Sequence, residues 1–185
     1  MMLKGIPNLL TVLRIVLIPI LVMSFLLREK SPYYVAAGIF IFASITDYLD
    51  GQLARIYKAQ TNLGRVLDPI ADKMLVASTL LMLVNAKMAP IAPTVAILCR
   101  EIFVSGMREY LAEIKVQLPV SFVAKIKTAL QMVSICFVLL GEEGSNIRYA
   151  DKIGYWGLWV TAALTLFSGY VYFRKSLDHL SCNNN

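Results

Sequence analysis

The sequence has few charged residues and no pattern of cysteine or histidine that would define a site. Only 16% of its 185 residues are charged, whereas about 25% is usual in soluble domains. Hydrophobic residues make up 58%, and the mean hydropathy is +0.65. Cys99, Cys136 and Cys182 are odd in number and show no CxxC spacing, so we expect free thiols rather than a disulfide framework. The one histidine, His179, lies in a polar tail, where we expect solvation rather than catalysis. The composition therefore argues against a water-soluble fold.

Six apolar segments predict an all-α integral membrane protein. One membrane-spanning helix takes about 20 apolar residues, so we expect a bundle of about six transmembrane helices and one membrane domain over residues 1–185. The segments cover residues 9–27, 34–48, 70–84, 91–104, 122–140 and 155–173. The second to the fourth reach membrane length only with polar flanks, which places charged groups against one end of the bundle. No small-residue cleavage site precedes Arg28, so we expect the first segment to be an uncleaved helix.

Basic residues are distributed unevenly between the two sides of this predicted bundle. Thirteen of the 18 lysines and arginines fall at one set of helix ends, and basic loops tend to stay in the cytoplasm. We therefore expect both termini, and the site described next, to face the cytoplasm. The net charge of +6 forms no contiguous basic face, so anionic lipid and phosphate are better partners than nucleic acid.

Four aspartates carry the chemistry that the sequence indicates. Asp47 and Asp50 are three residues apart, Asp68 and Asp72 are four apart, and both spacings share a helix face. The short segment 51–64 folds the second and third helices antiparallel, which brings the two pairs together. Four carboxylates near a bilayer repel one another unless cations neutralise them, and oxygen ligands suit Mg²⁺, Mn²⁺ or Ca²⁺ rather than zinc. We expect a centre of two divalent ions, the alternative being helix capping.

The run from Asp47 to Asp72 reads Asp-x2-Asp-Gly-x2-Ala-Arg-x8-Gly-x3-Asp-x3-Asp. It resembles the signature of the CDP-alcohol phosphotransferase family. Further similarity, in segments 6–14, 100–109 and 125–128, extends over nearly the whole chain and is to a bacterial branch that uses glycerol 3-phosphate. The resemblance implies six transmembrane helices, a homodimer in the bacterial inner membrane, and a polar cavity open to the cytoplasm.

The resemblance also implies a role for each residue of the signature. Asp47, Asp50 and Asp68 hold two ions, Mg²⁺ or Mn²⁺, together with Asp72, which is also the base. The residues implied in CDP-diacylglycerol binding are Gly51, Ala54, Arg55, Gly64, Thr61, Asn8 and Thr11. The two glycines and the alanine are small where a nucleotide would approach the helix backbone. The last three residues have helix capping as an alternative.

A second, cationic site is expected if the acceptor alcohol carries a phosphate. Arg100 and Arg108 are eight residues apart, and Lys125 and Lys127 open the next helix, so all four can face one cytoplasmic cavity. Arginine suits the bidentate binding of phosphate, and lysine adds a point charge. We expect Glu101 to orient one of these arginines. The alternative is that the basic side chains only reach toward the membrane interface.

Together these features predict an enzyme that transfers the phosphatidyl group of CDP-diacylglycerol to glycerol 3-phosphate and releases CMP. The basic cluster indicates a phosphorylated acceptor, but only the resemblance separates glycerol phosphate from inositol phosphate. A cation-coupled transporter is the alternative from another class, although transporters usually carry their charges near the midplane and often in repeated halves. A non-catalytic lipid-binding protein would have little use for four converging carboxylates.

Overall fold

All regular structure described for this chain is helical. The computed structural model describes residues 6–26, 31–57, 62–114, 116 and 122–182, with side chains for 10–26, 33–47, 64, 67–114, 116 and 123–177. The helices are α1 (Ile6–Leu26), α2 (Ser31–Tyr57), α3 (Asn62–Asn85), α4 (Ile91–Glu113), α5 (Phe122–Ser145) and α6 (Ala150–Cys182). The prediction of an all-α chain with six helices is confirmed for this part of the chain.

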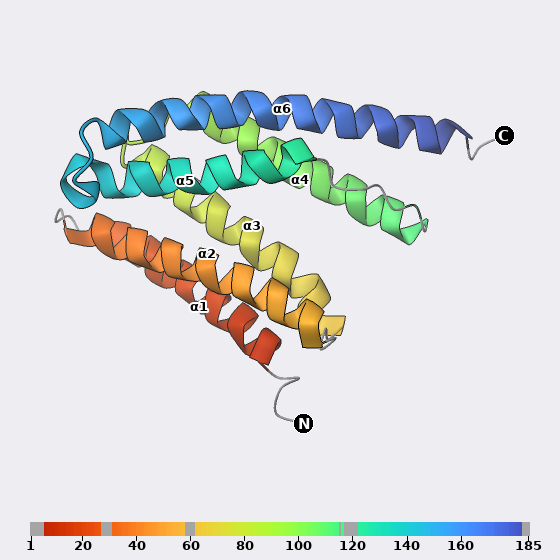
Figure 1. Ribbon diagram of the computed structural model, residues 1–185, viewed down its shortest axis with the longest axis horizontal. Coiled ribbons are helices and arrows are strands. Elements are labelled where there is room, and N and C mark those ends of the chain that lie inside the picture. Colours follow the sequence, from red (N-terminus) through yellow and green to blue (C-terminus); the bar gives the residue numbers. More distant parts are fainter. Residues whose placement is uncertain (1–5, 27–30, 58–61, 115, 117–121, 183–185) are drawn as a thin grey trace.

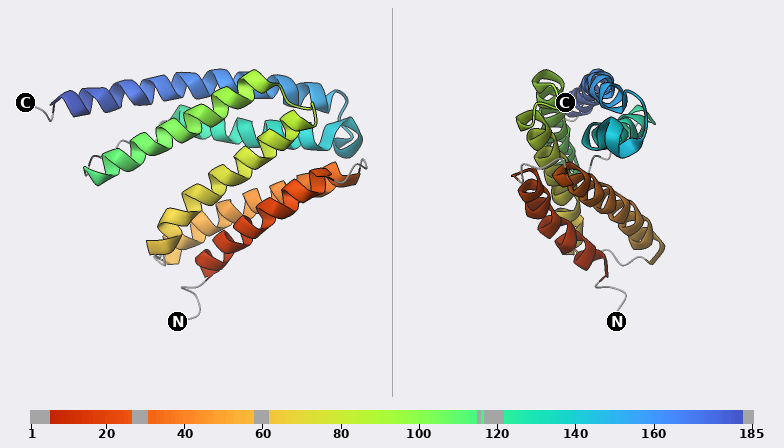
Figure 2. Two further views of the ribbon diagram at one scale, coloured as in Figure 1. Left: turned by 180° about the vertical axis from the view of Figure 1, so that it is seen from behind. Right: turned by 90° about the vertical axis from the view of Figure 1, so that its left-hand side faces the viewer.

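The helices form two units of three. In the N-terminal unit, α1 packs along α2 and α3, and in the C-terminal unit, α6 packs along α5 and α4. The units join mainly where α2 contacts α5, with fewer contacts from α3 to α4 and α5. Figure 1 shows α1 beside α2 and α5 beside α6, with α3 running diagonally between these two pairs, and Figure 2 shows the same arrangement from behind and from one end. Side chains at the boundary between the two units therefore have fewer packing neighbours than side chains inside either unit.

Successive helices alternate in direction. One end of the bundle therefore has the N-termini of α1, α3 and α5 and the C-termini of α2, α4 and α6. The N-terminal end of α1 and the C-terminal end of α6 lie at the same end, on the right in Figure 1, which we name the terminal end. Most of the largest fully buried apolar side chains belong to the opposite half of their helices, and Leu111, near the end of α4, is the exception. The others are Leu21, Phe40, Leu75, Leu80, Leu83, Ile97, Ile135, Val138, Leu139 and Leu158. Apolar packing therefore concentrates away from the terminal end, which leaves that end for polar groups.

Two glycines of α6 let it approach α5 closely. A Cβ atom on Gly154 would lie 2.6 Å from Val138 Cγ2 and 2.7 Å from the Val138 backbone nitrogen. A Cβ atom on Gly157 would overlap the side chain of Ser134. Small residues at such contacts let helix backbones pack tightly where hydrophobic burial alone does not drive association. The α5–α6 contact thus fixes the relative position of the polar side chains that these helices carry.

Two segments are long and apolar enough to cross a membrane, Val123–Ser145 and Ala150–Leu177. The apolar segments Leu10–Leu26 and Tyr33–Asp47 are shorter. Large apolar side chains face outward on several helices, among them Met23 at 61% exposure and Ile102 at 71%. Apolar surface of this extent suits contact with lipid, and the chain is consistent with a membrane protein.

Candidate active site

Two side chains of α1 hold two of the predicted metal-binding aspartates. The Thr11 hydroxyl donates a hydrogen bond to Asp68 Oδ1, and Arg14 Nη1 lies 2.6 Å from Asp47 Oδ1. The two α1 residues are three apart and so share a helix face. Arg14 is almost completely buried, with 1% of its side chain exposed, whereas Asp47 is 40% exposed. α1 therefore positions a carboxylate on α2 and another on α3.

Asp47, Asp68 and Asp72, the signature aspartates whose side chains are described, form one electrostatic group. Asp47 is close enough to Asp68 and to Asp72 for their negative charges to interact, and Arg14 attracts both Asp47 and Asp72. Among the side chains that the structure describes, no three acidic, histidine or cysteine groups are near enough together to hold a metal ion. The fourth predicted ligand, Asp50, lies in α2 beyond the described side chains. The group offers carboxylate oxygens, the donors that Mg²⁺ and Mn²⁺ prefer.

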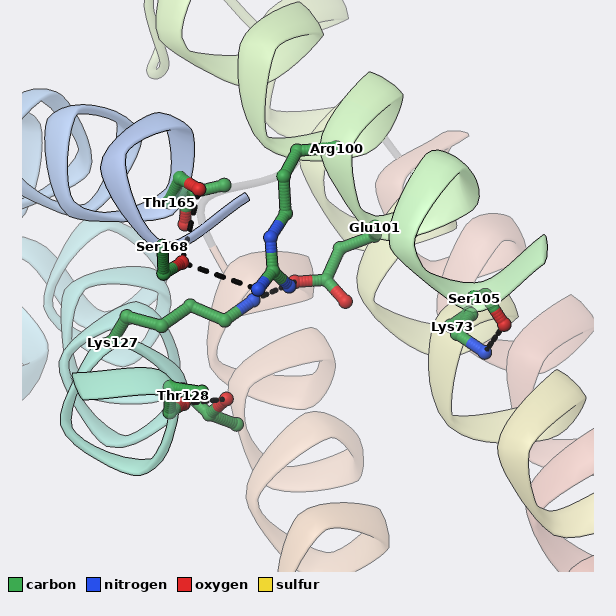
Figure 3. Close-up of polar contacts among 9 residues, drawn as sticks. Lys73, Arg100, Glu101, Ser105, Lys127, Thr128, Thr165 and Ser168 are labelled. Atoms are coloured by element: carbon green, nitrogen blue, oxygen red, sulfur yellow. Dashed lines mark hydrogen bonds and ion pairs between the residues drawn. The ribbon is translucent and has the colours of Figure 1, made fainter. Parts of the chain in front are cut away.

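The C-terminal unit contributes a cluster of opposite charge (Figure 3). Arg100 on α4 extends Nη1 to within 3.3 Å of Glu101 Oε1 and Nη2 to within 3.2 Å of Ser168 Oγ on α6. Lys127 on α5 donates to the same Glu101 oxygen. Gly169 makes room for the arginine, since a Cβ atom there would lie 2.9 Å from Arg100 Cγ. Three helices thus bring two cations to one carboxylate.

Asp72 of the aspartate group and Glu101 of the basic cluster both line one cavity of about 390 Å³ between α3, α4 and α5. Its polar lining residues are Asp72, Lys73, Glu101, Thr128 and Gln131. Its apolar lining residues are Met74, Val76, Ala77, Leu81, Leu98, Ile102 and Met132. A hydrogen bond from the Lys73 amine to the Ser105 hydroxyl joins α3 to α4 beside it (Figure 3). A cavity lined by both polar and apolar side chains suits a molecule with a charged head and a hydrocarbon body.

The other predicted site residues occupy different positions. Lys125 is exposed, whereas Lys127, two residues along α5, is buried, so the two lie on different faces of the helix. Arg108 is exposed, and its guanidinium carbon lies 6.0 Å from the centre of the Tyr172 ring. Gly64 is buried near the start of α3. The predicted residues outside the described residues or side chains are Asn8, Asp50, Gly51, Ala54, Arg55 and Thr61.

Several residues of the site were not predicted as site residues. Arg14 had a usable signal, because a charged residue inside an apolar helix needs a partner. Gln131 follows Lys127 by four residues and so shares its face of α5; it is 3% exposed, and its carbonyl oxygen has no hydrogen-bond partner among the described residues. No feature of the sequence indicates that Ser168 belongs to the site, because its contact with Arg100 depends on how α4 and α6 pack.

Comparisons with known proteins point to one family. Residues 4–167 match the model of the CDP-alcohol phosphatidyltransferase family. A protein of Rickettsia bellii is 44% identical over 171 residues, which cover 92% of this chain and 94% of the relative. A protein of Cereibacter sphaeroides is 37% identical, covering 95% and 97%. A protein of Bacillus subtilis is 36% identical, covering 97% and 99%. Each of the three is named CDP-diacylglycerol–glycerol-3-phosphate 3-phosphatidyltransferase.

Proposed function

Because this chain belongs to the CDP-alcohol phosphatidyltransferase family, we propose that it transfers the phosphatidyl group of CDP-diacylglycerol to sn-glycerol 3-phosphate. The products are phosphatidylglycerophosphate and CMP. The observation that carries the proposal is the cavity itself, where Asp72 from one unit lies opposite Glu101 and its paired cations from the other. A carboxylate beside a cationic site is what a phosphorylated alcohol needs, since one end must lose a proton and the other must bind through its charge.

In the proposed complex, the acceptor spans the cavity. Its phosphate binds at Arg100 and Lys127, with Arg108 and Lys125 nearer the membrane surface as further positive charges that attract it. Its hydroxyl points toward Asp72. The apolar walls formed by α3, α4 and α5 suit the diacylglycerol part of the donor. The CDP part binds along the signature between α2 and α3, through Gly51, Ala54, Arg55 and Gly64, with Asn8, Thr11 and Thr61 nearby.

The reaction is a displacement at the phosphorus that carries the diacylglycerol. The acceptor hydroxyl oxygen forms the new P–O bond while its proton passes to Asp72. The bond from that phosphorus to the bridging oxygen of the diphosphate breaks, and CMP leaves with the bonding electrons. Positioned proton transfer of this kind typically contributes about 10²–10⁴-fold to a rate. Arg14, which contacts Asp47, keeps positive charge beside the reacting group without contacting the donor.

Two Mg²⁺ or Mn²⁺ ions are the proposed cofactors, held by Asp47, Asp50, Asp68 and Asp72. The described carboxylates fit such ions by their chemistry, because carboxylate oxygens are the donors that Mg²⁺ and Mn²⁺ prefer and Asp47 interacts with both Asp68 and Asp72. When bound, divalent ions neutralise a diphosphate and stabilise negative charge on the leaving phosphate.

The proposed enzyme is a homodimer in the bacterial inner membrane, with six spans and both termini in the cytoplasm. Alternating helix directions and the common end of α1 and α6 (Figure 1) support an even number of spans. Thirteen of the 18 basic residues belong to the cytoplasmic side in this topology, in keeping with the positive-inside rule. The active site then opens toward the compartment that supplies soluble phosphorylated alcohols and CDP-linked donors.

A panel of acceptors tests the proposed reaction. Purified full-length protein is incubated with CDP-diacylglycerol, divalent metal and one alcohol at a time: glycerol 3-phosphate, inositol phosphate, glycerol or serine. We expect CMP release with glycerol 3-phosphate and a product of the mass of phosphatidylglycerophosphate. CMP release with inositol phosphate alone would show that inositol phosphate, and not glycerol 3-phosphate, is the acceptor. The absence of CMP release with every alcohol would refute the enzyme assignment.

Replacement of Asp72 by Asn tests the proposed base. The amide keeps the size of the side chain but does not accept the proton, so we expect kcat to fall by about 10²–10⁴-fold while CDP-diacylglycerol still binds in an equilibrium assay. The matched control is Asp151→Asn, an exposed carboxylate at the start of α6, which should leave turnover unchanged. Undiminished turnover of Asp72→Asn would exclude its role as base.

Removal of divalent metal tests the proposed cofactors. We expect EDTA treatment to abolish CMP release and added Mg²⁺ or Mn²⁺ to restore it, because the carboxylate group would otherwise repel the diphosphate of the donor. Donor binding, followed by equilibrium titration with CDP-diacylglycerol, should weaken in parallel. Full turnover after exhaustive chelation, with metal analysis showing no bound ion, would contradict this prediction.

A further inference from the structure

Glu101 is the anion that Arg100 and Lys127 contact. Its Oε1 atom accepts from both Arg100 and Lys127, which leaves one carboxylate shared by two cations. The cations are the more deeply buried members, with 9% and 3% of their side chains exposed against 23% for Glu101. Glu101 also lines the cavity that Asp72 lines. Figure 3 shows the Glu101 carboxylate against Arg100 and Lys127, and of these three residues only Glu101 lines that cavity.

Two buried cations side by side are unstable without an anion, because burial penalises each charge and the charges repel each other. Glu101 supplies one negative charge and two acceptor oxygens. A phosphate monoester supplies about 1.5–2 negative charges and three acceptor oxygens at neutral pH. A phosphate is thus the stronger partner for the same cations, whereas an uncharged alcohol offers them no charge in exchange for Glu101.

We infer that Glu101 is a resident counter-ion that determines acceptor specificity: it neutralises Arg100 and Lys127 before the acceptor binds, and among alcohols only one that carries a phosphate replaces it. An alcohol without phosphate leaves Glu101 in place and does not enter the cationic site. The cavity gives the displaced carboxylate space to turn away. This inference rests on the proposed function for the identity of the monoester, glycerol 3-phosphate, but its electrostatic part applies to any phosphorylated acceptor.

Replacement of Glu101 by Gln tests the inference with inorganic phosphate as the probe. The amide keeps the shape of the side chain without its negative charge, so the protein without ligand should unfold at a lower temperature than the wild type. Phosphate should bind the variant about tenfold more tightly, measured by isothermal titration calorimetry on full-length protein in detergent. Phosphate should also raise the unfolding temperature of the variant by more than it raises that of the wild type.

Two further variants test whether the change in phosphate affinity comes from the charge of Glu101 rather than from its shape or from a loss of folding. Glu101→Asp keeps the charge, so its phosphate affinity should stay closer to the wild-type value than that of Glu101→Gln. Glu113→Gln removes an exposed charge from the end of the same helix and should leave phosphate affinity unchanged. An unchanged or weaker phosphate affinity in Glu101→Gln would overturn the inference, and a weaker one would show that Glu101 instead holds the cations in position around the bound phosphate.

Steady-state kinetics give a second readout. In Glu101→Gln we expect KM for glycerol 3-phosphate to fall, and kcat to fall as well, because the product retains the terminal phosphate and would leave more slowly. KM for CDP-diacylglycerol should not change. A higher KM for glycerol 3-phosphate would contradict displacement. If phosphate binding changes as expected but the wild type transfers nothing to glycerol 3-phosphate, the proposed function fails and the counter-ion role stands for another phosphorylated acceptor.

Discussion

Charge neutralisation inside an apolar helix bundle is the constraint on which this structure depends. A buried charge is costly unless an opposite charge lies against it. Arg14 is buried against Asp47 in the N-terminal unit, and Arg100 and Lys127 are buried against Glu101 in the C-terminal unit. Each unit thus neutralises part of its own charge. Asp72 and Lys73 of α3 and Glu101 of α4 line the cavity between the units, and Arg100 and Lys127 contact Glu101. This arrangement suits a reaction that joins a diphosphate donor to a phosphorylated alcohol.

The division of the bundle into a packed half and a polar half explains how such charges are tolerated. Large apolar side chains fill the half away from the terminal end, and α5 and α6 approach closely there through Gly154 and Gly157. The α5 residues at that contact, Val138 and Ser134, carry no charge. The charged residues nearer the terminal end are therefore free to be arranged for binding, at a place where α3 has few contacts with α4 and α5.

Much of the fold, and part of the site, could be predicted from the sequence. Apolar segment lengths predicted six helices, and the spacing of Asp68 and Asp72 placed both on one face of α3, because these features depend on local periodicity alone. Contacts between helices could not be predicted from local periodicity. Arg100 meets Ser168, and Lys127 rather than Lys125 turns inward, because of how α4, α5 and α6 are rotated against one another. Glu101 was expected to orient an arginine, yet its contact with a lysine from another helix depends on the same packing.

The central claim is that donor and acceptor meet in the cavity between the two units. Thr128 lines that cavity and is accessible, so the most direct measurement is the rate at which a thiol reagent modifies Thr128→Cys in a variant whose three native cysteines are replaced by serine. An outward-facing reference is Ala163→Cys on α6. We expect CDP-diacylglycerol and glycerol 3-phosphate to slow modification at position 128 and not at position 163. Equal rates at position 128 with and without both substrates would contradict it.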